Sequence, residues 1–313
     1  MTTLDRYRGA LLGLAAGDAL GTTLEFERPG SFEPLTDMVG GGPFMLQAGQ
    51  WTDDTSMALC LAESLVAKQD FDPIHQLETY VRWWRDGHLS VKGYCFDIGG
   101  ATRGALHRFT QTHQPFCGDT SPSTAGNGSL MRLAPAPLAF ARDPARAVFI
   151  AGESSRTTHA ATECVDSCRY YAGLLLAALS GMPKRELLNN EYEPAVKCWI
   201  ENPLAEKVAQ IARGSFKVKE PPLIRGSGYV IHTLEAALWA FHTTATFRDG
   251  ALRVVNLGED ADTTGAVYGQ IAGAYYGADD IPSEWRDKLA MRDLIEQRAA
   301  ELHALGQIGR AHV

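Results

Sequence analysis

The chain has 313 residues, of which 45% are hydrophobic and 21% are charged, and its formal net charge is −8. This composition excludes disorder over most of the length, and the acidic balance disfavours nucleic acid as a partner. No apolar run approaches the roughly 20 residues that cross a bilayer, and the start MTTLDRYRG lacks the apolar segment of a secretory signal, so we expect a cytoplasmic protein without a membrane partner.

Apolar residues recur every three or four positions along most of the chain, which indicates helices. The predicted helices lie, in chain order, at 4–21, 56–67, 73–84, 98–109, from 144 onward, and at 163–179, 230–241 and 263–276. The third has the clearest boundaries, with Asp72 as N-cap, Pro73 in the first turn and Gly87 as the stop. We find no alternating strand of six residues or more. The predicted fold class is therefore all-α, in one compact domain over residues 1–313.

Glycines are spaced four apart in two of these helices. The two sets are Gly9, Gly13, Gly17 and Gly21, and Gly265, Gly269, Gly273 and Gly277. Each glycine inside a helix costs about 1 kcal/mol relative to alanine, so eight of them need a compensating gain. A spacing of four places each set on one helix face, where missing side chains allow another backbone to approach. We predict that both helices pack tightly at the centre of a bundle.

Two helix starts combine paired acids with threonines. One is Trp51-Thr52-Asp53-Asp54-Thr55, and the other is Glu259-Asp260-Ala261-Asp262-Thr263-Thr264. Helix capping explains one such residue at each start, but two acids plus threonines exceed that need. If the two starts meet, four carboxylates together with Glu25 require a counter-charge. Oxygen ligands of this kind select Mg²⁺ or Mn²⁺, and two acid pairs suggest two ions.

Four further features allow a structural or a functional interpretation. Long loops at 28–50 and 110–128 are candidates for function, and the glycines of Ala125-Gly126-Asn127-Gly128-Ser129 form either an anion site or an ordinary turn. His159 is either a structural hydrogen-bonding residue or a ligand-binding residue. Asp97 is a plausible N-cap of the helix at 98–109.

The cysteines give a weaker alternative metal site. None of the six forms a CxxC pair, so we predict reduced thiols in a reducing compartment. His159, Cys164 and Cys168 lie close together in the sequence, but no fourth ligand follows at zinc spacing. Two thiols on an apolar helix face are more typical of core packing than of a zinc site.

Taken in order, the segments resemble the ADP-ribosylglycohydrolase family. The matching segments, which span nearly 270 residues, are GALLGLAAGDALG (9–21), WTDDTSMAL (51–59), FDIGGATRGAL (96–106), AGNGSLMR (125–132), THAATECVDSCRYY (158–171), GYVIHTLEAALWAF (228–241) and NLGEDADTTGAVYGQIAGAYYG (256–277). The TDD and DADT motifs with GNGS between them are the most specific. The FDIG and GYV segments are most similar to the bacterial branch typified by dinitrogenase reductase-activating glycohydrolase.

This resemblance implies an orthogonal helical bundle with a dimetal cleft and a role for each matched residue. Two Mg²⁺ or Mn²⁺ ions would be held by Thr52, Asp53, Asp54, Asp260, Asp262 and Thr263. Substrate would be bound by Gly126, Asn127, Gly128, Ser129 and His159, with Tyr229 stacked on adenine. Asp97 and Glu25 would be the catalytic acids near the scissile ribose. The departures are small: Glu259 stands where many relatives have glycine, and Ala125 offers no aromatic ring where some relatives have one.

The implied reaction removes mono-ADP-ribose from a modified protein side chain, with arginine favoured. ADP-ribosylated protein would be the substrate, ADP-ribose the product, and the enzyme a monomer. Asp97 favours arginine because an acidic residue beside the anomeric carbon pairs with a cationic guanidinium. The alternatives are ADP-ribosyl-serine, O-acetyl-ADP-ribose or ADP-ribosylated nucleic acid as substrates, and a catalytically silent ADP-ribose-binding or structural relative.

Overall fold

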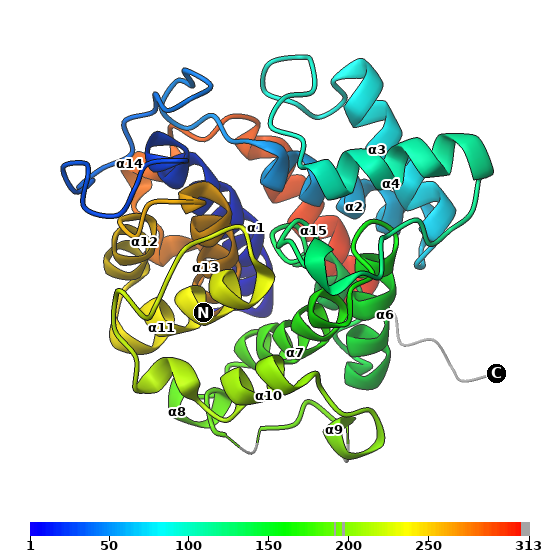
Figure 1. Cartoon of the computed structure of the whole chain (residues 1–313). Helices are drawn as coiled ribbons and strands as arrows, with labels where there is room; N and C mark the ends of the chain where they lie inside the picture. Colours follow the sequence, from blue (N-terminus) through cyan, green and yellow to red (C-terminus); the bar gives the residue numbers. More distant parts are fainter. Residues whose placement is uncertain (191, 196–197, 308–313) are drawn as a thin grey trace.

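The computed structural model describes residues 1–190, 192–195 and 198–307. The longer helices are α1 (Thr3–Gly21), α2 (Asp53–Lys68), α3 (Pro73–Asp86), α4 (Gly100–Thr112), α6 (Pro144–Arg156), α7 (Thr162–Leu179), α11 (Val230–Thr243), α12 (Phe247–Val255), α13 (Ala261–Tyr276) and α15 (Arg292–Gln307) (Figure 1). Shorter ones are α5 (Pro135–Ala139), α8 (Lys184–Leu187), α9 (Cys198–Glu201), α10 (Glu206–Ala212) and α14 (Ser283–Arg286), with single 3-10 turns η1 (Thr22–Leu24), η2 (Pro122–Thr124), η3 (Ser215–Lys217) and η4 (Ala278–Asp280). No β-strand occurs in these ranges, and the all-α prediction is confirmed.

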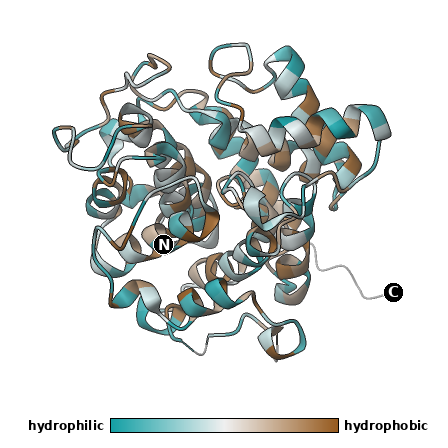
Figure 2. Cartoon of the chain, viewed as in Figure 1, coloured by the Kyte–Doolittle hydropathy of each residue, from teal (hydrophilic) through white to brown (hydrophobic). Residues whose placement is uncertain are grey.

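Local sequence signals set the helix boundaries. The Asp72 carboxylate accepts hydrogen bonds from the backbone N–H groups of Ile74 and His75, and Gly87 ends α3 in the left-handed conformation. Outer helices such as α3 carry hydrophilic and hydrophobic residues on different faces (Figure 2). The predicted starts of α2 and α13 were two to three residues late, because Asp53, Asp54 and Asp262 lie inside the first turns rather than before them.

Helices α1 and α13 pack against each other over their whole length, and α2, α7, α11, α12 and α15 contact one or both of them. Figure 1 shows this pair side by side, although the two helices come from opposite ends of the chain. The helices are antiparallel, since Gly9 faces Gly273 whereas Gly17 faces Gly265.

The glycine faces make this packing possible. A Cβ atom on Gly13 would lie 2.2 Å from the carbonyl oxygen of Gly269, and one on Gly17 would lie 2.0 Å from that of Gly265. Real Cβ atoms essentially never come so close to backbone atoms. The predicted close approach of the two glycine-bearing helices is confirmed, and it places the C-terminal end of α1 beside the N-terminal end of α13.

One hydrophobic core extends from Tyr7 in α1 to Leu305 in α15. Trp51, Trp83 and Trp285 are among its largest fully buried side chains. In the part of the chain that the structure describes, no helix has the length and apolar character that a membrane span requires.

Candidate active site

The two acidic helix starts meet where α1 ends. The Thr52 hydroxyl oxygen lies 3.2 Å from Oδ2 of Asp262, and the Thr263 hydroxyl lies 3.4 Å from Oδ2 of Asp54. We call the acids gathered here the carboxylate cluster; its members are Asp18, Glu25, Asp53, Asp54, Asp97, Asp260 and Asp262. Oxygen atoms within 4.8 Å of one another come from Asp18, Asp54 and Asp262, and in a second group from Glu25, Asp97 and Asp262.

Capping does not explain these acids. Thr52 is the N-cap of α2 and Asp260 is the N-cap of α13, yet neither side chain accepts a capping hydrogen bond. The N-cap of α4 is Gly99, so the prediction of Asp97 as a cap is wrong. Asp97 has a φ of 58°, in the left-handed region that Asp tolerates better than most residues. Its carboxyl lies in the cluster, within reach of Glu25 and Asp53.

Asp18 is a functional candidate that the sequence analysis missed. It is fully buried in α1, and its carboxylate accepts hydrogen bonds from the backbone N–H and hydroxyl groups of both Thr52 and Thr55, over 2.6 to 3.0 Å. These bonds fix Thr52 beside Asp54 and Asp262. The available signal was an acid flanked by glycines on the packed face of a very apolar helix.

Burial and mutual repulsion raise the pKa values throughout the cluster. Burial raises the pKa of Asp18 to about 6. Burial, reinforced by the charges of Asp260 and Asp18, raises the pKa of Asp97 to about 7. Burial, followed by the charge of Asp97, raises the pKa of Glu25 to about 10. The cluster therefore holds protons near neutral pH when no cation balances it.

A cation fits this donor set. The buried oxygens Oδ1 of Asp54, Oδ1 of Asp262 and Oε2 of Glu25 have no hydrogen-bond donor within the described ranges. Burying a polar atom without a partner is costly, and a metal ion would satisfy several such oxygens at once. The ligands on offer are carboxylate and hydroxyl oxygens, which hard divalent cations prefer. His159, Cys164 and Cys168 belong to neither group of metal-binding geometry found among the described residues.

A cavity of about 670 Å³ connects the carboxylate cluster to the segment Gly126–Ser129, which we call the glycine loop. Its lining includes Glu25, Asp53, Asp97, Asp260, Asp262 and Thr263 on the acidic side and Gly126, Asn127, Gly128 and His159 on the other. A Cβ atom on Gly128 would lie 2.8 Å from Cε1 of His159, so only glycine leaves this wall open. The cavity thus joins the carboxylate cluster to a wall of small residues.

The imidazole of His159 lines this cavity. Arg132 donates to Oγ1 of Thr158 over 2.6 Å, and that hydroxyl lies 2.8 Å from Nδ1 of His159. In the tautomer in which Thr158 donates its proton to Nδ1, the imidazole carries its own proton on Nε2. Burial and the charge of Arg132 lower the pKa of His159 to about 3. The ring is therefore neutral.

Two predicted substrate-binding side chains are engaged elsewhere. Asn127 donates from Nδ2 to Oδ2 of Asp260 over 2.7 Å and to Thr233 over 2.9 Å. Its side chain thus positions an acid of the carboxylate cluster. The Ser129 hydroxyl accepts from the Ser155 hydroxyl over 2.7 Å and does not line the cavity. Asn127 still lines the cavity whereas Ser129 does not, and a sequence pattern does not reveal where a loop side chain points.

Tyr229 lies on a second hollow, of about 580 Å³, which adjoins the cavity. Both share Gly100, Ala101, Gly126 and Gly228 in their linings. The Tyr229 hydroxyl contacts Glu163 and Lys207, and its ring packs edge-on against His232 at 5.1 Å between centroids. The Lys207 ammonium also lies 5.1 Å from the centroid of this ring, so Tyr229 borders the second hollow with its ring held by neighbours.

Comparisons with known proteins agree with this arrangement. A family model described as ADP-ribosylglycohydrolase matches residues 1–311. ADP-ribosylarginine hydrolase Tri1 of Pseudomonas putida is 47% identical over 96% of this chain and 78% of its own length. ADP-ribosyl-[dinitrogen reductase] glycohydrolase of Rhodospirillum rubrum is 35% identical over 92% of this chain and 91% of its own. A solved structure named ADP-ribosylglycohydrolase-related protein complex superposes with a TM-score of 0.85 at 44% identity, covering 97% of this chain and 99% of that one.

Proposed function

The chain belongs to the ADP-ribosylglycohydrolase family, and from this premise we propose that it removes mono-ADP-ribose from arginine side chains of proteins. The bond cleaved joins the anomeric carbon of the ribose to a guanidinium nitrogen. A relative with 47% identity carries the name ADP-ribosylarginine hydrolase. The observation that carries the proposal is the single cavity, which places Asp97 and Glu25 opposite the Gly126–Gly128 wall and His159.

The glycine wall suits the diphosphate and distal ribose of ADP-ribose. Missing side chains at Gly126 and Gly128 let a ligand approach the backbone, and the Nε2–H group of His159 donates to a phosphate or ribose oxygen. Because the imidazole is neutral, it binds as a hydrogen-bond donor and not as a charge. The second hollow accommodates the adenine beside Tyr229, whose ring stacks on it.

We propose that two divalent cations, Mg²⁺ or Mn²⁺, bind in the carboxylate cluster. Thr52, Asp53, Asp54, Asp260, Asp262 and Thr263 would hold them, with Asp18 fixing Thr52 and Asn127 fixing Asp260. Such ions orient ribose hydroxyls and lower the pKa of a bound water.

Asp97 and Glu25 are the proposed catalytic residues. Without a cation, burial and the charges of Asp260 and Asp18 raise the pKa of Asp97 to about 7, and a carboxyl at this place can exchange a proton with the leaving group. In its ionised form, Asp97 also pairs with the guanidinium and stabilises positive charge that develops on the ribose ring. Glu25 lies against Asp97 and Asp262, where it can exchange a proton with a water.

Further features of the structure support proposals about the domain organisation, the cellular compartment and the oligomeric state of the enzyme. A main core from Tyr7 to Leu305, with only a small second cluster of Ala147, Val148 and Leu176 among the described residues, supports one domain, although residues 308–313 lie outside the described ranges. Its six cysteines are free, which fits a reducing compartment. We propose that the enzyme works as a monomer in the cytoplasm and releases free ADP-ribose.

Divalent cations are expected to stabilise the protein more at pH 8 than at pH 5. In the folded protein the pKa of Asp97 is raised to about 7 and that of Asp18 to about 6, from 3.8. Without a cation, the stability from these protonated carboxyls is complete below about pH 4 and is lost as pH rises through 7. A bound cation balances the ionised carboxylates and so removes this loss of stability at high pH. Melting temperatures with Mn²⁺ and with a chelator at both pH values measure the effect, and an equal rise at both would contradict it.

Asp97→Asn is expected to reduce release of ADP-ribose from ADP-ribosylated arginine by about 10²- to 10⁴-fold, the range for loss of general acid–base catalysis. Because Asp97 caps no helix, the melting temperature should not fall. Affinity for free ADP-ribose, measured by calorimetry, should change little because this ligand lacks the guanidinium. Single-turnover cleavage and thermal melts on the same sample separate the chemical role from a structural one.

The control and the substrate panel test the remaining alternatives. Asp143→Asn changes an acid that caps α6 and does not line the cavity, and asparagine caps equally well, so this variant should keep full activity. The wild type is compared on arginine-, serine- and DNA-linked ADP-ribose and on O-acetyl-ADP-ribose. Faster cleavage of any other linkage than of arginine would overturn the proposed specificity, and no cleavage of any substrate would support a catalytically silent relative.

A further inference from the structure

Two loops border the end of the cavity where Glu25 and Asp97 lie. One runs from residue 25 to 52, and the other from 87 to 99, between α3 and α4. They contact each other through the rings of Phe44 and Phe96, whose centroids are 5.2 Å apart. The Lys92 ammonium also donates to the Phe44 carbonyl over 2.5 Å. The two loops therefore form one continuous surface beside the two proposed catalytic acids.

This surface is rich in exposed apolar side chains. Phe26 is 67% exposed, Met45 85% and Tyr94 57%. The partly buried ring of Phe96 packs against those of Phe44 and Tyr94, and Phe44 directly precedes Met45. We call these five residues the apolar rim. Phe26 directly follows Glu25 and itself lines the cavity. An exposed group of large apolar residues is uncommon on a protein without a partner at that place.

Backbone conformation adds a second, independent observation. Phe26 has a φ of 65° and Met45 a φ of 51°, a region that glycine and asparagine adopt readily and bulky residues rarely do. Neither residue gains much burial in return, because both side chains are mostly exposed. Strained residues that persist without a packing gain are typical of functional surfaces. Contact with a bound molecule would supply the missing gain.

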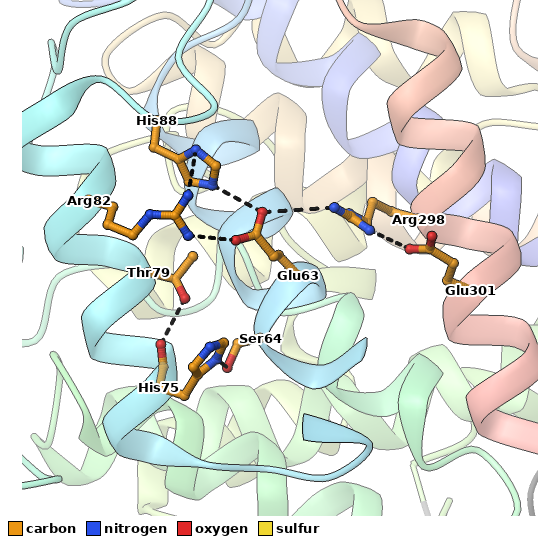
Figure 3. Close-up of polar contacts among 8 residues, drawn as sticks. All are labelled: Glu63, Ser64, His75, Thr79, Arg82, His88, Arg298 and Glu301. Atoms are coloured by element: carbon orange, nitrogen blue, oxygen red, sulfur yellow. Dashed lines mark hydrogen bonds and ion pairs between the residues drawn. The ribbon is translucent and has the colours of Figure 1, made fainter. Parts of the chain in front are cut away.

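The rim is held in place before any partner arrives. His88, at the start of the second loop, donates from Nε2 to Glu63 of α2 over 3.0 Å, and Glu63 also accepts from Arg82 of α3 over 2.9 Å (Figure 3). Arg298 of α15 lies 3.8 Å from the same carboxylate. Three helices thus fix the base of the loop that carries Tyr94, Phe96 and Asp97. A preformed surface loses little conformational entropy on binding.

The direction in which ADP-ribose extends through the cavity indicates which molecule contacts the apolar rim. The second hollow adjoins the cavity at Gly126 and Gly228, and its lining contains neither Glu25, Phe26 nor Asp97. The nucleotide part of ADP-ribose therefore extends away from the rim, and whatever is attached to the anomeric carbon leaves on the side of Glu25 and Asp97. For a modified arginine, the attached group is the rest of the substrate protein.

We propose that the apolar rim is the docking surface for the protein that carries the ADP-ribosylated arginine. This inference rests on the proposed function and adds the partner's chemistry: an apolar patch next to the modified arginine. Phenylalanine, tyrosine and methionine are the side chains enriched in protein interfaces, and a few such residues contribute most of the binding free energy. The rim thus selects among modified proteins, whereas the cavity recognises the ADP-ribose they share.

The test compares one linkage in two contexts, a protein with an ADP-ribosylated arginine and free ADP-ribosyl-arginine. Met45→Asn and Tyr94→Ser remove apolar side chains outside the cavity, and asparagine tolerates the positive φ at position 45. We expect each variant to lower kcat/KM on the protein about five- to tenfold through KM, the usual effect of losing an interface anchor, with the free amino-acid substrate unaffected. Val218→Asn, which is 86% exposed on the segment between α10 and α11, is the matched control and should change neither substrate.

Each outcome decides the question. Selective loss on the protein substrate, with unchanged melting temperatures, supports the rim as the docking surface. Equal losses on both substrates, or none on either, overturn it while the wild-type activity keeps the proposed function standing. A wild-type enzyme inactive on both arginine substrates overturns the proposed linkage, and the docking inference with it.

Discussion

Asp262→Asn is expected to abolish measurable hydrolysis and yet to raise the melting temperature of the metal-free protein. Asp262 is buried, its Oδ1 has no hydrogen-bond donor in the described ranges, and it belongs to both groups of metal-binding geometry. Burial and the charges of Glu25 and Asp54 raise its pKa. An amide removes one acid from this repulsion and adds a donor. Losing a metal ligand worth several kcal/mol in the transition state should slow turnover by about 10³-fold or more.

Thermal melts and calorimetry measure both halves of this prediction. We expect the variant to melt a few degrees higher than the wild type in chelator, about what 1 kcal/mol produces in a chain of this size, and to gain much less from Mn²⁺. Asp279→Asn, on an exposed acid paired with Arg286 over 3.4 Å, should leave activity and metal response unchanged. A variant less stable than the wild type in chelator would show that Asp262 stabilises the fold directly.

Gly269→Ala is expected to destabilise the protein by about 3 kcal/mol or more, the upper range for overpacking a core. In most helices, replacing glycine by alanine stabilises by about 1 kcal/mol. Here a Cβ atom would lie 1.9 Å from the carbonyl oxygen of Gly13, and backbone atoms of two packed helices cannot move aside singly. The helices must separate, which also separates Asp18 from Asp262. Denaturant unfolding of the variant measures the loss.

Gly104→Ala is the matched control, because at this position the same substitution is not expected to destabilise the protein. Gly104 lies inside α4, and its added Cβ would meet only the end of the Arg108 side chain at 3.5 Å. The Gly104→Ala variant should be as stable as the wild type or up to about 1 kcal/mol more stable. If Gly269→Ala were equally well tolerated, the close packing of α1 and α13 would not be the reason for their glycines.

Helices and their boundaries were predictable because their signals are local. The cap at Asp72 and the stop at Gly87 act within one turn, and the structure has both. The glycine spacing predicted a contact between distant helices. Glycines four residues apart leave one helix face without side chains, and close approach of another backbone is the main gain from such a face. What the spacing did not reveal is the antiparallel register, which depends on how the intervening residues fold.

The site was harder to predict, since its residues act across elements. Asp18 looks like the interior of an apolar helix, and only the contacts from Thr52 and Thr55 show its part in the carboxylate cluster. Asp97 sits where caps are common, and the left-handed backbone that removes it from the helix leaves no mark in the sequence. Asn127 and Ser129 belong to the right loop, but side-chain direction within a loop follows from tertiary packing.

The pairing of α1 with α13 has a consequence for how the enzyme is made. About 240 residues separate Gly21 from Ala261, so a nascent chain emerges from the ribosome with the glycine face of α1 lacking its partner until synthesis is nearly complete. Domains fold as units while synthesis proceeds from the N-terminus, and here no fragment that stops before α13 contains both halves of the carboxylate cluster. A truncated translation product therefore has neither a complete carboxylate cluster nor activity, and the exposed face of α1 marks it for chaperones and proteases.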